Sequence, residues 1–138
     1  MTSGAAPIPD IECFLRRIKL EMRTLNRFSF VTRKANMDCL ANLGVTVAVA
    51  QDEIMSLTYQ DYDRGPLPDH SREGEVWEFV KDIGGIAVYI KLKLDPGRGC
   101  VCLSFHESSG PVALPYRRDA QPGNPDQEHA ACRRVVRG

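Results

Sequence analysis

Residues 76–106 read VWEFVKDIGGIAVYIKLKLDPGRGCVCLSFH, and this stretch decides the fold. Apolar and polar side chains alternate along it, which is typical of strands half-buried in an antiparallel sheet. Gly84 and Gly85 predict a two-residue hairpin turn, because glycine supplies the positive φ that such turns need. A second turn follows at DPGRG, residues 95–99. We therefore expect three consecutive antiparallel strands.

The glycine turn sets the pairing of the first two strands. Pairing outward from it puts apolar residues opposite one another on one face, so the register is self-consistent. The second turn is looser, and a shift of two residues would keep the faces and change only the neighbours. The expected pairs of the first hairpin are Trp77 with Leu92, Phe79 with Ile90, Glu78 with Lys91 and Val80 with Tyr89. Those of the second are Leu94 with Val101, Leu92 with Leu103, Ile90 with Phe105, Lys91 with Ser104 and Tyr89 with His106.

The same alternation places one set of polar residues together on the non-core face of the sheet. The set is Glu78, Tyr89, Lys91, Lys93, Ser104 and His106. A polar stretch at 59–75, YQDYDRGPLPDHSREGE, leads into the sheet and carries Arg64, His70 and Arg72. Its Gly-Pro and Pro-Asp pairs predict a loop rather than a helix or a central strand. Loops of this length are often functional or mobile.

These residue types suit cleavage of an RNA phosphodiester without a metal ion. A carboxylate or imidazole can accept the 2′-hydroxyl proton, and another ionisable group can donate to the leaving oxygen. Lysine or arginine can stabilise the charge that develops on the phosphate, and tyrosine can stack on a base. The alternative is the ordinary wet face of an antiparallel sheet, where Glu opposite Lys is a common pair. Alternation and composition alone favour this alternative.

The N-terminal half is predicted to be helical. Between Pro9 and Leu25, apolar residues recur every three or four positions, which indicates an amphipathic helix with one buried stripe. The stripe consists of Ile11, Phe14, Leu15, Ile18, Met22 and Leu25. A short extended stretch, FSFV, follows at 28–31.

Two further helices are expected after this extended stretch. Thr32 is the predicted N-cap of a helix that runs to Leu43 and ends at Gly44. Thr46 begins the next helix, although the β-branched residues of VTVAVA would also suit a strand. Helices followed by consecutive strands predict an α+β fold, with N-terminal helices packed on a small antiparallel sheet.

Length and composition favour one domain. Hydrophobic residues make up 43% of the 138, enough for one packed core but not for two. We expect a flexible N-terminus at 1–8, a folded domain at 9–116, and a disordered tail at 117–138, where Pro and Gly are frequent and periodicity is weak.

Charge and motifs narrow the function classes. Lys+Arg and Asp+Glu number 18 each, so any nucleic-acid surface must be a local patch. There is no membrane-spanning stretch or signal segment, so we expect a cytoplasmic protein. Five scattered cysteines disfavour a disulfide framework, and Cys100 with Cys102 lacks a second ligand pair, so no metal site or cofactor is expected. Glycine-rich phosphate loops and the GxSxG elbow are absent from the sequence.

Several runs, taken together, resemble the MqsR family of type II toxin–antitoxin toxins, which are small RelE-like mRNA interferases. The runs are VTRKA (31–35), LTYQDYDRGP (57–66), VWEF (76–79), VYIKLKL (88–94) and LSFH (103–106). The resemblance covers residues 28–116. It depends on the order and spacing of the YIKL and SFH runs after a tryptophan-containing strand, because no single motif is diagnostic.

This resemblance implies a RelE-like fold and ribosome-independent cleavage of single-stranded mRNA by general acid–base chemistry. It also implies a zinc-containing antitoxin as the cognate partner and a toxin that needs no metal of its own. Matched position by position, the family's catalytic residues fall on Arg64, Glu78, Tyr89 and His106, and Lys91 is the lysine of the YIK motif. Arg72, Lys93 and Ser104 are the RNA-binding candidates of the same surface.

At three of these positions the chain departs from the family, which has lysine, glutamine and lysine where Arg64, Glu78 and His106 stand. Arginine keeps the charge with a different geometry, glutamate adds a negative charge near the phosphate, and histidine titrates near neutral pH. We therefore expect Glu78 or His106 to serve as base and acid, Lys91 and Arg64 to stabilise phosphate charge, and Tyr89 to orient the substrate. The alternative is a non-catalytic RelE-like module that binds a protein or nucleic acid.

Overall fold

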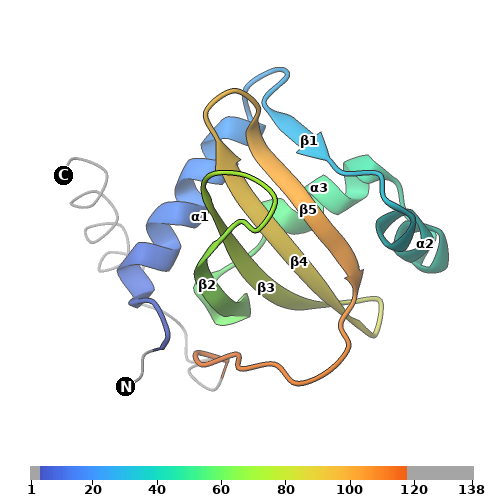
Figure 1. The fold of residues 1–138 in the computed structure, drawn as a ribbon. Coiled ribbons are helices and arrows are strands. Elements are labelled where there is room, and N and C mark those ends of the chain that lie inside the picture. Colours follow the sequence, from blue (N-terminus) through green and yellow to red (C-terminus); the bar gives the residue numbers. More distant parts are fainter. Residues whose placement is uncertain (1–3, 118–138) are drawn as a thin grey trace.

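The three expected strands form the centre of a five-stranded sheet in an α+β fold (Figure 1). The computed structural model describes residues 4–117. The helices are α1 (Ile8–Met22), α2 (Lys34–Leu43) and α3 (Val47–Met55), and a 3₁₀ turn, η1, spans Tyr59–Asp61. The strands are β1 (Phe28–Phe30), β2 (Tyr62–Pro68), β3 (Glu75–Ile83), β4 (Ile86–Asp95) and β5 (Gly99–Glu107), in the spatial order β1-β5-β4-β3-β2.

The β3–β4 hairpin has the predicted register throughout. Gly84 and Gly85 form the turn with φ of 59° and 84°, values that L side chains rarely adopt. All four predicted pairs of this hairpin are confirmed, from Trp77 with Leu92 to Val80 with Tyr89.

The predicted β4–β5 pairing is confirmed in one half of the hairpin and wrong in the other. The pairs of Tyr89, Ile90 and Lys91 with His106, Phe105 and Ser104 are confirmed. Beyond them a register shift leaves Leu103 in a bulge, so Leu92 pairs with Cys102 and Leu94 with Cys100 instead of the predicted partners Leu103 and Val101. The bulge turns both cysteine side chains into the core, where each is fully buried and burial raises the pKa of its thiol.

Asn36 of α2 explains how this bulge is tolerated. Its amide donates to the carbonyls of Val31 (2.8 Å) and Leu103 (3.1 Å), and its own carbonyl accepts from the Phe105 amide (3.0 Å). The side chain is fully buried, so it satisfies backbone groups of β5 that β1 is too short to reach.

The sheet is mixed, which corrects the expectation of a purely antiparallel one. The extended stretch at 28–31 is confirmed as β1, but it runs parallel to β5, pairing Phe28 with Cys100 and Phe30 with Cys102. The two strands approach closely at Gly99, where an added Cβ would lie 2.3 Å from the Arg27 carbonyl oxygen. Only glycine permits this approach.

The stretch 59–75 is not one long loop. It contains η1 and the edge strand β2, which pairs antiparallel with β3 through two irregularities around Arg64. Proline is tolerated in β2 because an edge strand need not donate every backbone N–H. Only residues 69–74 remain as a loop, and the sequence pattern missed the strand because Gly65 and Pro66 interrupt its alternation.

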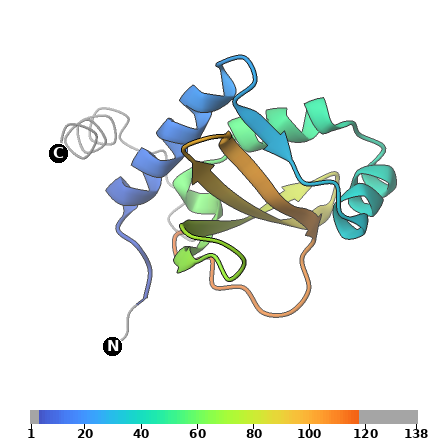
Figure 2. The same cartoon turned by 45° about the horizontal axis from the view of Figure 1, so that its top comes forward.

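Helices α1 and α3 cover one face of the sheet (Figure 2). The predicted stripe of α1 is confirmed from Ile11 to Met22, and Phe14 stacks on Trp77 with ring centroids 4.7 Å apart. The helix ends at Met22 rather than Leu25, whose side chain is 86% exposed. None of the helices within residues 4–117 is both long and apolar enough to cross a membrane.

The predicted caps of the other two helices are partly confirmed and partly wrong. The residue before α2 that acts as N-cap is Arg33, not Thr32, and no side chain caps this end. Gly44 ends α2 in the left-handed conformation, as predicted. Thr46 caps α3 by accepting a hydrogen bond from the Val49 amide at 3.2 Å, so this segment is a helix rather than a strand.

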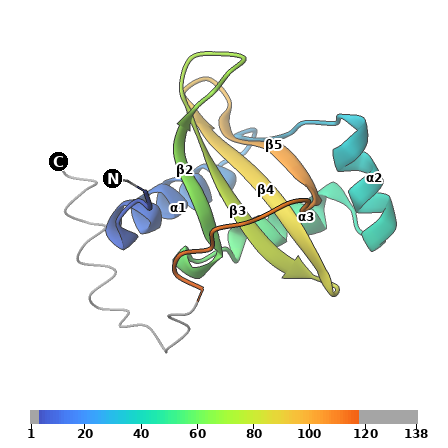
Figure 3. The ribbon, with the colours of Figure 1, turned by 60° about the horizontal axis from the view of Figure 1, so that its bottom comes forward.

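After β5, residues 108–117 cross to the other side of the molecule (Figure 3). The Ser108 amide bonds the Ala87 carbonyl, and Tyr116 donates to the carbonyl of Ala6, which is itself buried. Disorder is predicted for residues 117–138, of which 118–138 lie outside the described residues, and the predicted flexible N-terminus, residues 1–8, is not described at residues 1–3.

Candidate functional site on the open face of the sheet

The predicted polar residues do share one face, which is the face opposite α1 and α3. We call it the polar face and define its central row by Arg64, Glu78, Lys91 and Ser104, on β2, β3, β4 and β5 in turn. The next row along the strands contains Val80, Tyr89 and His106. The register alone determines this grouping.

Arg64 and Glu78 form the closest charged contact on the polar face. The Arg64 Nη2 and Nε atoms lie 2.9 and 3.2 Å from the same Glu78 oxygen, Oε1. Glu78 is only 5% exposed, whereas the Arg64 side chain is 62% exposed. The arginine therefore neutralises a buried carboxylate and still presents guanidinium N–H groups to solvent.

Tyr89 connects this ion pair to His106. Burial raises the pKa of the Tyr89 hydroxyl, and its hydrogen bond to the Glu78 carboxylate raises it further. The hydroxyl is thus a proton donor to Glu78 at neutral pH. Its ring lies 5.2 Å from the His106 ring between centroids, at 42°. The His106 Nδ1 atom lies 3.2 Å from the Glu107 carbonyl oxygen, so Nε2 is left for proton exchange when Nδ1 carries the proton.

Lys91 lies between Glu78 and Ser104 in the central row. It is half-buried and makes no hydrogen bond or ion pair within residues 4–117, so its ammonium remains available. Ser104 is buried, which makes it a poor contact for a ligand.

Lys93 and Arg72 are less accessible to a ligand bound over the central row, for different reasons. Lys93 is buried, and its ammonium donates to the Asp69 carboxylate (2.7 Å) and to the Glu73 carbonyl (2.6 Å). The hydrogen bonds from Lys93 and Ser71 lower the pKa of Asp69 to about 2. Arg72 is exposed on the loop that this ion pair holds, beyond the row of Lys93.

Sequence reasoning missed Asp63. Its carboxylate is 4% exposed, and Oδ1 accepts hydrogen bonds from the backbone amides of Ala113 (2.5 Å) and Leu114 (3.1 Å). Its other oxygen, Oδ2, lies 3.8 Å from the Arg64 Nε. Nothing in the local pattern marks this aspartate, because its partners are about fifty positions away in the chain.

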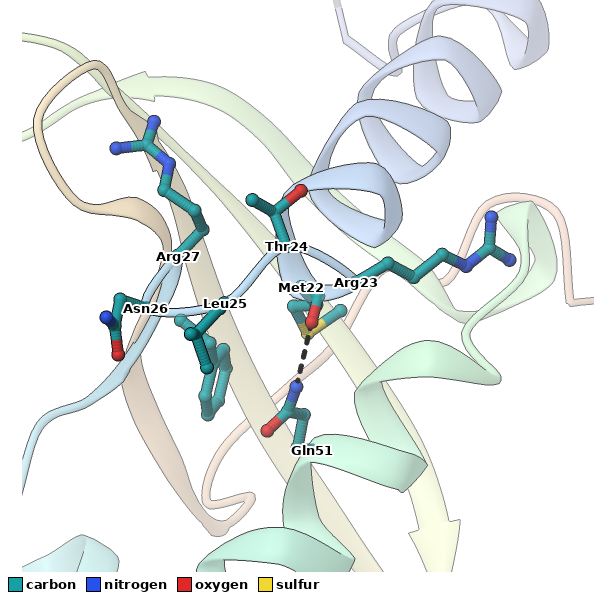
Figure 4. A pocket seen from close by; sticks show the side chains of 8 residues that line it. Met22, Arg23, Thr24, Leu25, Asn26, Arg27 and Gln51 are labelled. Carbon is teal, nitrogen blue, oxygen red and sulfur yellow. Dashed lines mark hydrogen bonds between the residues drawn. The ribbon is translucent and has the colours of Figure 1, made fainter.

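A shallow pocket of about 420 Å³ lies away from these residues, at the turn between α1 and β1 (Figure 4). It is lined by residues 22–28 and Gln51, whose amide donates to the Met22 carbonyl at 3.5 Å. None of the predicted site residues lines it. Arg23 and Arg27 extend away from one another there, so the pocket does not bring their guanidinium groups together.

Within residues 4–117, no group of three or more His, Cys, Asp or Glu side chains is arranged to hold a metal ion. No family model, curated protein or solved structure matches this chain. The polar face is therefore the feature of the described residues that bears on function.

Proposed function

We propose that this protein is a metal-independent endoribonuclease with a RelE-like fold, which cleaves single-stranded mRNA as the toxin of a type II toxin–antitoxin system. The observation that carries the proposal is the arrangement of one face. An exposed arginine on β2, a lysine on β4 that has no partner within residues 4–117, and a tyrosine–histidine ring pair on β4 and β5 share this face, as the resemblance to MqsR toxins implies. Cations to stabilise phosphate charge and an imidazole for proton transfer are thus present on the same face.

His106 is the proton-transfer group in this proposal. It accepts the 2′-hydroxyl proton as the 2′-oxygen attacks phosphorus, and the bond from phosphorus to the 5′-oxygen then breaks. Lys91 and Arg64 stabilise the negative charge that develops on the phosphate oxygens, and the leaving oxygen takes a proton from the Lys91 ammonium or from water. The products are a 2′,3′-cyclic phosphate and a 5′-hydroxyl.

Glu78 is assigned a different role from the one that its residue type first suggests. It is buried and already accepts from Arg64 and Tyr89, so it is poorly placed to take a proton from substrate. We assign it to positioning, because it orients the guanidinium and the tyrosine hydroxyl. Its pairing with Arg64 also reduces the repulsion that an extra carboxylate would exert on RNA phosphates.

The test compares His106→Ala with wild type on single-stranded RNA in the presence of EDTA. We expect wild type to cleave and to leave 2′,3′-cyclic phosphate ends, and His106→Ala to lose about 10²–10⁴ in kcat/KM. His70→Ala is the matched control, since this exposed histidine lies on the 69–74 loop away from the ring pair and its loss should leave activity unchanged.

The proposal is wrong if purified wild type cleaves no RNA and its expression does not slow growth. RNA binding without cleavage would instead favour the non-catalytic module, for which Arg64 and Lys91 supply the phosphate contacts. A neighbouring open reading frame with paired CxxC motifs would support the partner proposal, a zinc-containing antitoxin.

A further inference from the structure

Residues 108–117 are bound to the sheet at two points, one on β4 and one on β2. At one end the Ser108 amide bonds the Ala87 carbonyl of β4. At the other, the amides of Ala113 and Leu114 bond Asp63 of β2. Because β3 lies between β4 and β2 in the sheet, the chain runs from one side of β3 to the other, and Figures 1 and 3 show it doing so past the β3–β4 turn end of the sheet. We call residues 108–117 the crossing segment.

The end of the crossing segment is held more firmly still. The Arg117 guanidinium donates to the carbonyls of Val80 (2.7 Å) and Gln60 (3.2 Å) and to the Asp61 carboxylate (3.3 Å). Val80 belongs to the polar face, in the row of Tyr89 and His106, yet it is buried. The crossing segment is therefore held at its end by the backbone of β3 and η1.

Asp63 links this segment to the charged part of the site. One of its carboxylate oxygens accepts both amides of the segment, and the other lies 3.8 Å from Arg64 Nε. Leu114 has a positive φ of 40°, an unfavourable conformation for leucine that the two hydrogen bonds to Asp63 help to maintain. One buried side chain thus sets the place of the segment relative to Arg64.

The crossing segment offers a different kind of contact from the rest of the face. Residues 108–116, SSGPVALPY, carry no charge, and Val112 is 41% exposed although it is apolar. The cations Arg64 and Lys91 suit phosphates, whereas an uncharged, partly apolar chain that begins two positions after His106 and is bound by Asp63 suits the faces of nucleobases.

We propose that the crossing segment is the base-contacting wall of the RNA site and that Asp63 is the positioning residue that holds it there. This inference rests on the proposed function, since it names the part of the substrate that this side of the site contacts. Phosphates lie over the central row and at least one base packs against the segment and the Tyr89–His106 rings. The segment contributes to binding of RNA rather than to proton transfer.

The experiment uses Asp63→Asn and Asp63→Ala, which remove the same charge but differ in one respect. The asparagine oxygen can still accept from the Ala113 and Leu114 amides, whereas alanine cannot. Binding is measured on a 2′-O-methyl oligonucleotide, which lacks the nucleophile and cannot be cleaved. We expect Asp63→Ala to bind about tenfold more weakly than Asp63→Asn, with the Ala113 and Leu114 amides exchanging faster with solvent. On cleavable RNA the same factor should appear in KM, with kcat unchanged.

The salt dependence of oligonucleotide affinity distinguishes a contact with bases from a general electrostatic effect. Because the segment is uncharged, the ratio between the two variants should stay constant from about 50 to about 200 mM salt, while the affinity of both falls. The same pair of substitutions at Asp38, an exposed residue paired with Lys34 on α2, is the control and should show no difference. If Asp63→Ala does not fold, Val112→Ser decides, because it alters only an exposed side chain and should weaken binding about threefold at every salt concentration.

Equal affinities of Asp63→Asn and Asp63→Ala, a ratio that shrinks as salt is added, or an unaffected Val112→Ser would each overturn the inference. A wild-type protein that binds the oligonucleotide but cleaves no RNA would refute the proposed function alone. Binding by the Asp63 and Val112 variants would still test whether the crossing segment contacts bases. A wild-type protein that does not bind would refute both.

Discussion

Lys91 and Lys93 lie two residues apart on the same strand and the same face, yet they have different surroundings. Lys93 is buried and its ammonium is held by Asp69 and Glu73. Lys91 is half-buried and has no partner within the part of the chain that the structure describes. One lysine is committed to the fold, and the other is free to meet a ligand.

The difference comes from the 69–74 loop. It folds back over the end of β4, and Gly74 lies so close that an added Cβ would be 2.9 Å from Lys93 Cε. The loop therefore covers Lys93 and stops before Lys91. Alternation along the strand thus assigns each lysine to the polar face. The 69–74 loop decides which of the two ammonium groups is paired within the fold and which is accessible to a ligand.

The largest expected effect is on activity at the free lysine. Lys91→Met removes the ammonium that stabilises phosphate charge, so kcat/KM for single-stranded RNA should fall by about 10²–10³. Because Lys91 has no partner to lose within residues 4–117, the melting temperature should change little. A variant with near-wild-type cleavage would show that Lys91 is as dispensable as an ordinary solvated lysine.

The matched substitution at the other lysine should affect stability instead. Lys93→Met leaves the Asp69 carboxylate without its counter-ion, and we expect the melting temperature to fall by roughly 10 °C. The folded fraction should cleave RNA within a few-fold of wild type. Strong loss of activity in a fully folded Lys93→Met protein would contradict the structural role.

The structural role of the Asp69–Lys93 ion pair should also appear in the pH dependence of stability. The folded-state pKa of Asp69 is lowered from 3.8 to about 2, so its carboxylate stabilises the fold above pH 3.8 and this contribution is lost as pH falls towards 2. Asp69→Asn should be less stable than wild type at pH 7, and the gap should close between about pH 4 and about pH 2. Urea unfolding at a series of pH values measures it, and a gap that persists at pH 2 would refute the assignment.

The smallest effect is in the salt dependence of binding. If Lys91 contacts one phosphate, Lys91→Met should lower the slope of log Kd against log salt by about 0.7 for a single strand. Lys93→Met should leave the slope as it is in wild type. Equal slopes for the two variants would remove the distinction between the lysines.

Much of the fold follows from local pattern. The glycine turn and the alternation around it predict the β3–β4 register, and the apolar spacing of α1 predicts its buried stripe. Gly44 and Thr46 mark their helix ends for local steric and hydrogen-bonding reasons. Each of these features depends on residues close together in the chain.

The features that the pattern missed depend on residues far apart. The bulge at Leu103 is stabilised by Asn36, which lies 67 positions earlier in the chain. Asp63 acts on a segment about fifty residues later. No short window of sequence contains both halves of any of these interactions.

Which side chains share the polar face follows from the sequence alone, because the side-chain period of a strand is two and the glycine turn sets its phase. Only the tertiary structure decided what those side chains are free to do. It paired Glu78 with Arg64, buried Lys93 under a loop, left Lys91 without a partner among residues 4–117 and bound the Ala113 amide to Asp63. The physical reason is that burial and pairing of a charge depend on which distant segments cover it, and strand periodicity carries no information about that.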